Sequence, residues 1–166
     1  MSMPRKVAVY LDKSKFSFAQ IEHDKVYTAK GLAAKLHCSQ DSLVKNILVR
    51  MDGELAMVLL PASEKIDVQA LRAETNIHNL KLLSEREIEE EFPDYDLGEI
   101  PPFANLLNCK IYLSDHLLRS ETLYFNVGTY TDAIACKTKD YIQLEHPKIV
   151  NFSEKYNEFN DIRWHM

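Results

Sequence analysis

The sequence predicts a single α/β (α+β) domain, in which helices pack against a mixed β-sheet. Strand-like segments with alternating apolar residues are interleaved with amphipathic segments of helical period. At 166 residues, 46% of them apolar, the chain is long enough to bury a core without disulfide bonds. It contains no repeat or low-complexity tract, so we expect one domain over residues 1–153 and a partly ordered C-terminal tail over 154–166.

The N-terminal segment predicts a helix, a strand and a second helix. Residues 4–15 place Val7, Tyr10 and Leu11 on one stripe of a helix, and residues 16–21 alternate as in a strand. Thr28 is a suitable N-cap for a helix over residues 29–37, which is rich in Ala, Leu and Lys.

The central segment, residues 43–60, predicts a β-hairpin with its turn at residues 51–53. In the first strand the alternation puts Leu43, Ile47 and Val49 on one face. The second strand, residues 55–60, is apolar almost throughout, which is typical of a central strand that is covered on both faces.

Lys45 falls on the apolar face of the first strand. A lysine in an apolar row is costly unless its ammonium group reaches water or meets an anion. We therefore expect Lys45 to point toward a cavity or its rim. The alternative is that the side chain extends past the sheet edge into water without any functional role.

The rest of the chain predicts short alternating elements. Asp67 can cap a helix through Glu74, and the S-x-x-E form of residues 84–87 predicts a capping box at the start of an acidic helix. Thr138 is expected to cap a final helix through about residue 144. Strands are expected over residues 80–83, 110–113, 122–127 and 133–137.

The charge distribution is uneven. The net charge is −5, which argues against indiscriminate nucleic-acid binding. Residues 1–50 hold nine Lys or Arg against four Asp or Glu, while the remaining residues hold 11 against 21. The basic third could steer a polyanion to one side of the molecule, or it could simply be a set of solvated helix-surface charges.

Several classes of site are not indicated by the sequence. The three cysteines are odd in number and far apart, and the six histidines lack metal-ligand spacing, so we expect no disulfide framework, metal or cofactor. Neither a Gly-rich nucleotide-binding loop nor a nucleophile elbow is present. The N-terminus lacks a secretory signal and no apolar run could span a bilayer, so we expect a cytoplasmic protein without membrane contact.

Two glycine loops could accompany Lys45 in a site. Gly98 precedes Pro101 and Pro102, and Gly128 lies between two predicted strands. Glycine lets backbone N–H groups approach a ligand closely, which suits an anion or a carbonyl oxygen. Taken alone, residues 98–102 could equally be an ordinary connecting loop.

Taken together, these residues resemble a known protein family. Lys45 in an apolar strand, the G-x-x-x-P loop Gly98-Glu99-Ile100-Pro101-Pro102, and Asn126-Val127-Gly128 before a closing strand resemble the YbaK/EbsC family. These are aminoacyl-tRNA deacylases, similar to the editing insertion domain of prolyl-tRNA synthetase. The likeness runs from about residue 5 to about Ser153.

The resemblance implies a partly barrel-like sheet surrounded by helices, and a trans-editing hydrolase that cleaves the ester at the 3′ end of mischarged aminoacyl-tRNA. It implies that Lys45 is required and engages the terminal phosphate or adenosine, and that the loop from Gly98 polarises the ester carbonyl. A synthetase or an elongation factor is a possible further partner. The implied substrate-binding residues are Pro101, Pro102, Phe103, Asn126, Gly128, Thr129, Asp132 and, at the rim, His23.

Two departures from the family pattern concern the substrate. Ala104 stands where many relatives have glycine, and the loop from Gly128 to Asp132 lacks the histidine found in the synthetase-inserted versions. Pocket size decides which amino acid is accepted, and a small pocket would admit Ala, Ser or Cys. Two other readings stay open: a non-catalytic module that binds tRNA or a synthetase, and a small-molecule hydrolase that uses the same pocket.

Overall fold

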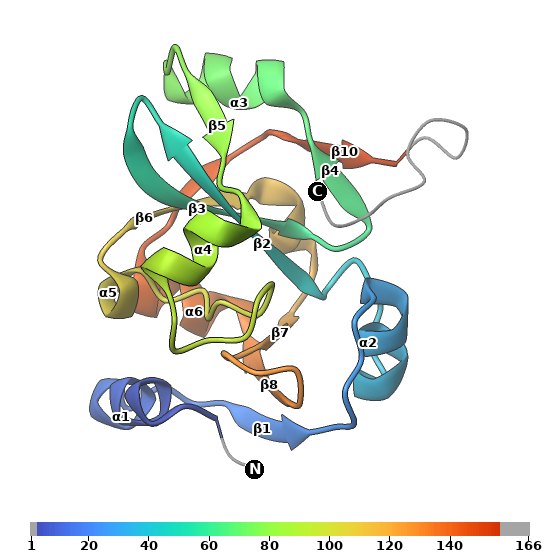
Figure 1. The fold of residues 1–166 in the computed structure, drawn as a ribbon. Helices are drawn as coiled ribbons and strands as arrows, with labels where there is room; N and C mark the ends of the chain where they lie inside the picture. Colours follow the sequence, from blue (N-terminus) through green and yellow to red (C-terminus); the bar gives the residue numbers. More distant parts are fainter. Residues whose placement is uncertain (1–2, 157–166) are drawn as a thin grey trace.

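The computed structural model describes residues 3–156, and in this part of the chain three β-sheets are surrounded by six α-helices (Figure 1). The predicted mixed α/β class is confirmed, and none of the described sheets closes into a barrel. The largest sheet has the strand order β5-β2-β3-β6-β9, with bounds Leu80–Leu82, Val44–Met51, Glu54–Pro61, Lys110–Ser114 and Lys148–Val150.

The predicted central hairpin is confirmed. Strands β2 and β3 pair antiparallel over eight residues each, and the turn residues Asp52 and Gly53 both have positive φ, at 50° and 88°. Strand β3 is the middle strand of the sheet. Its side chains alternate between two buried apolar clusters, with Met57 in one and Val58 in the other, because both faces of the strand are covered.

Two smaller sheets flank the large one. An antiparallel sheet has the order β1-β8-β7, with bounds Ala19–Glu22, Asp132–Lys137 and Thr122–Asn126. Strands β4 (Glu64–Ile66) and β10 (Ser153–Lys155) form a short antiparallel ribbon. Strand β1 starts three residues later than predicted, because Phe16 and Phe18 pack against the core instead of pairing.

Three of the six α-helices begin where their capping residues predict. The Thr28 hydroxyl accepts from the Gly31 N–H, the Asp67 carboxylate accepts from the Ala70 N–H, and the predicted capping box at Ser84 is present. The helices are α1 (Arg5–Ser14), α2 (Ala29–Leu36), α3 (Val68–Thr75), α4 (Glu85–Glu91), α5 (Ala104–Leu107), α6 (Thr138–Glu145) and the 3₁₀ helix η1 (Asp115–Arg119).

The prediction that Thr138 caps the last helix is wrong. Strand β8 runs directly into α6, so Lys137 occupies the N-cap position. The Thr138 hydroxyl instead donates to the Ser120 carbonyl at 2.5 Å, which ties the start of α6 to the segment before β7.

Of the predicted C-terminal tail, residues 154 and 155 belong to β10, and residues 157–166 lie outside the described part of the chain.

Phe103 is the centre of the main core. It is fully buried, and its ring packs against those of Tyr10, Phe125 and Tyr141 at centroid distances of 5.5, 5.7 and 6.2 Å. These rings join α1, β7 and α6 to the loop that follows Gly98.

Within residues 3–156 none of the helices is both long and apolar enough to cross a membrane.

Gly128 joins the two glycine loops that the sequence singled out. Its N–H donates to the Glu99 carbonyl at 2.7 Å, and its carbonyl accepts from the Asp96 N–H at 2.8 Å. Its φ is 96°, and a Cβ there would lie 2.7 Å from the Pro4 ring and 2.9 Å from the Tyr95 ring. The loop before α5 and the β7–β8 turn are therefore held together at a position that requires glycine.

We predict that Gly128→Ala destabilises the protein more than Gly53→Ala. Both glycines have positive φ, which costs an alanine about 1–2 kcal/mol. Nothing lies within 4 Å of a Cβ at Gly53, whereas the clash at Gly128 adds about 1–3 kcal/mol. Urea unfolding of both variants measures the difference, and equal losses would show that the contact with Pro4 and Tyr95 is not tight.

Candidate active site

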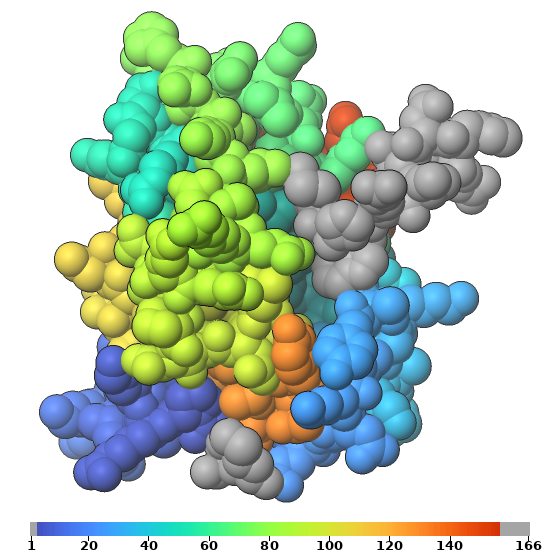
Figure 2. Space-filling model, in the orientation of Figure 1, coloured from blue at the N-terminus to red at the C-terminus, as the bar shows by residue number. Residues whose placement is uncertain are grey.

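A cavity of about 590 Å³ lies beside the central hairpin. It is enclosed by β2, by the residues before α2, by the start of α4, by the Gly98 loop and by the end of β7. Figure 2 shows three of these regions meeting on one face of the molecule: the α4 to Gly98 segment (yellow-green), the β7–β8 turn (orange) and the start of α2 (blue). The lining is mostly apolar, with a few polar side chains, which is the usual composition of a small-molecule site.

Asn46 contributes one of those polar groups from β2. Its Nδ2 donates to the Ile100 carbonyl at 3.1 Å, so the side chain bridges from the strand to the loop that follows Gly98. Its Oδ1 is buried and has no hydrogen-bond partner among the described residues. A buried carbonyl oxygen without a partner is costly, and a ligand that donates a hydrogen bond would remove that cost.

Asn126, at the end of β7, contributes a second polar group to the cavity wall. The residue is 6% exposed, and its Oδ1 lies 2.9 Å from His23 Nε2. The other ring nitrogen of His23 lies 2.8 Å from the Asp24 carbonyl, so the imidazole is held on both sides. With Oδ1 toward His23, as the structure places it, Asn126 Nδ2 lies on the Glu99 side and makes no hydrogen bond of good geometry within residues 3–156.

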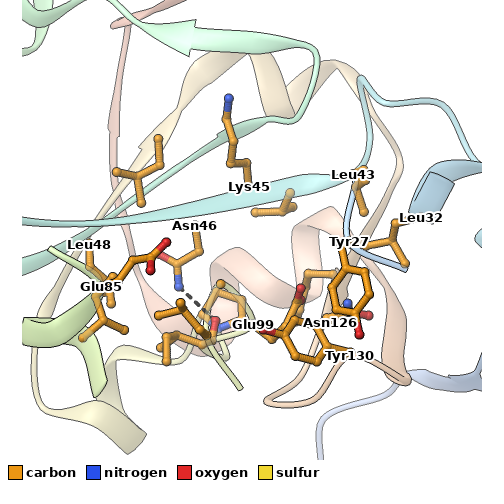
Figure 3. A pocket seen from close by; sticks show the side chains of 18 of the residues that line it. Tyr27, Leu32, Leu43, Lys45, Asn46, Leu48, Glu85, Glu99, Asn126 and Tyr130 are labelled. Atoms are coloured by element: carbon orange, nitrogen blue, oxygen red, sulfur yellow. Dashed lines mark hydrogen bonds between the residues drawn. The ribbon is translucent and has the colours of Figure 1, made fainter. Parts of the chain in front are cut away.

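Glu99 adds a carboxyl group next to Asn126 (Figure 3). Burial in the cavity wall raises the pKa of Glu99, the Asn126 amide partly opposes this shift, and the negative charge of Asp96 adds to it, so that the pKa is about 8. At neutral pH the carboxyl group of the empty site is therefore mostly protonated.

Lys45 lines the same cavity, but its ammonium group lies on the other face of β2. Neighbouring strand residues alternate, and Figure 3 shows Lys45 and Asn46 pointing to opposite sides of the strand. Lys45 Nζ donates to the Glu64 carbonyl at 2.6 Å and to the Tyr156 hydroxyl at 2.8 Å. Burial lowers the pKa of Lys45 to about 7, and the Glu64 carboxylate partly opposes this shift.

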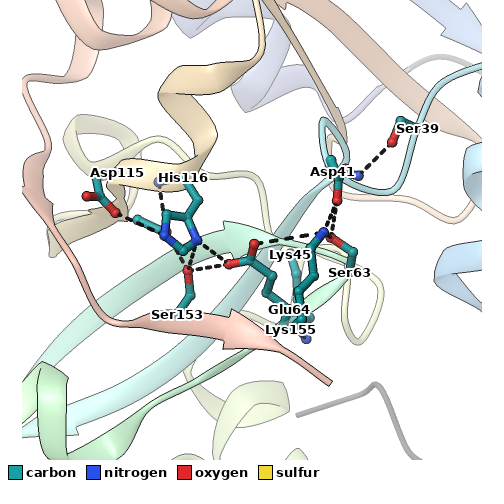
Figure 4. A network of polar contacts seen from close by, with 10 residues as sticks. Ser39, Asp41, Lys45, Ser63, Glu64, Asp115, His116, Ser153 and Lys155 are labelled. Carbon is teal, nitrogen blue, oxygen red and sulfur yellow. Dashed lines mark hydrogen bonds and ion pairs between the residues drawn. The ribbon is translucent and has the colours of Figure 1, made fainter. Parts of the chain in front are cut away.

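A buried polar network supports the lysine from β4 (Figure 4). The Glu64 carboxylate is 3% exposed, accepts from the Ser153 hydroxyl at 2.6 Å and lies 2.7 Å from His116 Nδ1. These contacts join β4, β10 and η1. The Glu64 backbone carbonyl, which contacts Lys45, therefore belongs to a segment with little freedom to move.

The predicted site residues fall into three groups. Lys45, Gly98, Pro102 and Asn126 line the cavity. His23 and Gly128 lie behind the lining and contact Asn126 and Glu99, as described above. The others are not among the lining residues: Pro101, Phe103, Thr129 and Asp132.

Thr129 and Asp132 stabilise the β7–β8 turn. The Thr129 hydroxyl donates to the Asp132 carboxylate at 2.7 Å and accepts from the Asp132 N–H at 3.0 Å. Both side chains are buried. Their contacts shape the turn that carries Tyr130 to the cavity, so an effect on a ligand would be indirect.

Among the lining residues that the sequence did not single out as site residues are Asn46, Glu99, Tyr27 and Tyr130. Asn46 had a signal, since it is a polar residue inside an apolar strand. The rings of Tyr27 and Tyr130 contact each other at 5.0 Å, and Tyr27 is 69% exposed. Nothing local in the sequence brings these two tyrosines together, because they lie about 100 residues apart in two loops that meet only when β1 pairs with β8.

The comparisons with known proteins agree with this architecture. The signature of the aminoacyl-tRNA editing domain family matches residues 23–144. The multifunctional Ser/Thr-tRNA deacylase ProXp-y of Escherichia coli strain K12 is 23% identical over 154 residues, which cover 89% of this chain and 91% of that protein. All the cavity-lining residues lie inside the matched segment.

Two solved structures show the same fold. Hypothetical protein APE2540 has a TM-score of 0.81 at 19% identity, with 90% of this chain and 100% of that chain covered. A candidate trans-editing enzyme for prolyl tRNA synthetase has a TM-score of 0.77 at 17% identity, with 90% and 96% covered.

We predict that Glu99 makes stability depend on pH. Its pKa in the folded chain, about 8, lies above its ordinary value of 4.5, so the folded chain binds this proton more tightly than the unfolded chain. The resulting stabilisation is fully present below pH 4.5 and is lost as the pH rises through 8. Urea unfolding between pH 4.5 and 8.5 should show a steeper loss for the wild type than for Glu99→Gln.

The matched control is Glu89→Gln, which removes an exposed carboxylate from α4 outside the cavity. It should follow the wild-type pH profile. Because Lys45 is retained in all three proteins, its own titration cancels in the comparison. A constant difference between wild type and Glu99→Gln across this range would contradict a buried, neutral Glu99.

Proposed function

The chain belongs to the aminoacyl-tRNA editing domain family, and from this premise we propose that it is a trans-acting hydrolase that removes wrongly attached amino acids from tRNA. The observation that carries the proposal is the cavity between β2 and the Gly98 loop, whose wall holds the amide groups of Asn46 and Asn126, each with one buried atom that makes no hydrogen bond of good geometry among the described residues. Such a wall is suited to a small ligand that brings both a hydrogen-bond donor and an acceptor.

The reaction requires polarisation of an ester carbonyl. Water adds to the carbonyl carbon, the bond to the terminal ribose oxygen breaks, and that oxygen takes up a proton, which releases the amino acid and the tRNA 3′ end. In this proposal Asn126 Nδ2 and the backbone N–H of Gly98 donate to the carbonyl oxygen as its negative charge develops. Fixed donors of this kind are typically worth about 3–4 kcal/mol in the transition state.

The proposal needs no nucleophilic side chain. Burial raises the pKa of Cys109 to about 11 and that of Cys136 to about 12, so neither supplies a thiolate near neutral pH. Neither cysteine is among the residues that line the cavity. An aminoacyl ester is already activated, so an oriented water with a polarised carbonyl is a sufficient mechanism.

Lys45 is proposed to contact the 3′-terminal nucleotide. Lys45 is one of the residues that line the cavity, and its ammonium group lies on the side of β2 opposite Asn46, away from the proposed carbonyl site, which suits a phosphate or adenosine attached to the ester. The network around Glu64 would hold the ammonium in place. A synthetase or an elongation factor that delivers the tRNA is part of this proposal, because the net charge of −5 gives the chain little general affinity for nucleic acid.

The relative's name suggests where to look for the substrate. ProXp-y of Escherichia coli is named as a Ser/Thr-tRNA deacylase. We propose that this chain also acts on tRNA carrying a small amino acid, with Ser and Thr as the first candidates and Ala and Cys as the next.

We predict that the protein deacylates at least one member of a panel of Ser-, Thr-, Ala- and Cys-charged tRNAs, and that Lys45→Ala lowers kcat/KM by at least about 10-fold. Loss of a charge-assisted contact of about 1.5–3 kcal/mol has an effect of this size. The control is Lys148→Ala, which removes an exposed lysine from β9. Circular dichroism and urea unfolding establish that both variants are folded.

Three outcomes separate the readings. Activity that is lost in Lys45→Ala and kept in Lys148→Ala supports the hydrolase and the place of its site. Binding of tRNA without hydrolysis of any panel member would favour a non-catalytic module. Full activity of Lys45→Ala would contradict the role given to Lys45 while leaving the hydrolase intact.

A further inference from the structure

Two carboxyl groups line the cavity, and their surroundings differ. Glu85, at the start of α4, is exposed to solvent. Glu99 lies on the Gly98 loop, partly buried, and its backbone carbonyl is held at 2.7 Å by the Gly128 N–H. The loop position of Glu99 is therefore fixed, and its carboxyl group is next to the Asn126 amide rather than in bulk water.

The polar atoms in the cavity wall form a specific pattern. Asn126 Nδ2 is a buried donor that faces the Glu99 carboxyl group without a hydrogen bond of good geometry, and Asn46 Oδ1 is a buried acceptor with no partner within the described residues. The Glu99 carboxyl group lies adjacent to the Asn126 donor and becomes a second acceptor when a cation ionises it. A complementary ligand has one acceptor oxygen and, within a few ångström of it, a group that donates several hydrogen bonds and carries positive charge.

An aminoacyl ester has this pattern. Its carbonyl oxygen accepts one hydrogen bond, and one carbon away its α-ammonium group donates three and is cationic. With the carbonyl oxygen at Asn126 Nδ2, the ammonium group would face the neighbouring Glu99 carboxyl group. The cation of Lys45 does not compete, because Figure 3 shows it on the opposite side of β2 from Asn46.

We propose that Glu99 is a specificity-determining residue that recognises the free α-ammonium group of the aminoacyl ester. The protein then acts on aminoacyl-tRNA with an unmodified amino group and discriminates against N-acylated aminoacyl-tRNA. This inference rests on the proposed function, and it adds a substrate requirement that the editing activity alone does not include.

The other titratable groups near Glu99 do not replace it in this role. Asp96 accepts from the Tyr130 N–H at 3.0 Å and so is already engaged in the β7–β8 turn. His23 contacts the far side of Asn126, and Tyr130 is a hydroxyl donor at the cavity wall. Glu85 is solvated, so its attraction for a cation is weakened by water.

A bound cation would change the protonation of Glu99. In the empty site the carboxyl group is mostly protonated below pH 8. An ammonium group beside it favours the carboxylate, so binding at pH 6.5 should release a proton to the buffer. A role that is merely structural would release none.

The test uses calorimetry with 3′-(L-serylamido)-3′-deoxyadenosine, an analogue that has an amide in place of the ester, and its N-acetyl derivative. Titrations at pH 6.5 in two buffers of different ionisation enthalpy give the number of protons released. For the wild type we expect close to one proton with the free-amino analogue and none with the N-acetyl analogue. The N-acetyl analogue should bind on the order of 10- to 100-fold more weakly.

Two variants test whether Glu99 is the residue that recognises the ammonium group. Glu99→Gln should abolish the proton release and reduce the preference for the free-amino analogue to a few-fold. Glu89→Gln, the exposed control, should behave as the wild type does. Equal binding of the two analogues by the wild type, absence of proton release, or failure to bind the free-amino analogue would each overturn the inference.

A second assay distinguishes failure of this inference from failure of the proposed function. Hydrolysis of Ser-tRNA and N-acetyl-Ser-tRNA by the wild type is measured in parallel. A protein that hydrolyses both equally is a deacylase in which Glu99 lacks the proposed role. A protein that hydrolyses no charged tRNA, yet binds the free-amino analogue with proton release, retains the recognition but not the activity.

Discussion

The antiparallel pairing of β2 with β3 over eight residues is the constraint on which the site depends. It fixes the register of β2, and alternation along the strand then sends Lys45 and Asn46 to opposite faces of the sheet. A slip of one residue would exchange the two side chains and would also expose the apolar positions of β2. The same pairing that forms the core therefore places an ammonium group on one side of the strand and an amide on the other.

The second requirement is that two distant loops meet. Gly128 links the β7–β8 turn to the Gly98 loop through two backbone hydrogen bonds, and Asn126 and Glu99 are brought together beside that junction. His23, more than 100 residues away from Asn126 in sequence, orients its amide. The cavity wall is thus held by backbone contacts and by side chains that do not themselves line it, which leaves the lining groups available to a ligand.

Much of the fold could be predicted from local patterns. The hairpin, the capping box at Ser84 and the caps at Thr28 and Asp67 all follow from residues close together in sequence. Strands β4, β9 and β10 have three residues each, too few to show a period, and they are stabilised by contacts such as Glu64 with Ser153, 89 residues apart. The same holds for the site. Lys45 and Gly98 could be predicted from their immediate neighbours in the sequence. The role of Glu99 could not, because it depends on burial and on the contact with Asn126, and both arise only when the two loops come together in the fold.

The most direct test of the account is whether an aminoacyl group enters the cavity on the Asn46 side of β2. Side-chain amide resonances in ¹⁵N spectra report this, with the free-amino adenosine analogue as ligand and the exposed Asn151 as an internal control. If the aminoacyl group binds there, the Asn46 and Asn126 amide resonances shift and the Asn151 resonance does not. Unchanged Asn46 and Asn126 resonances at saturating analogue would contradict it, because the ester would then bind elsewhere.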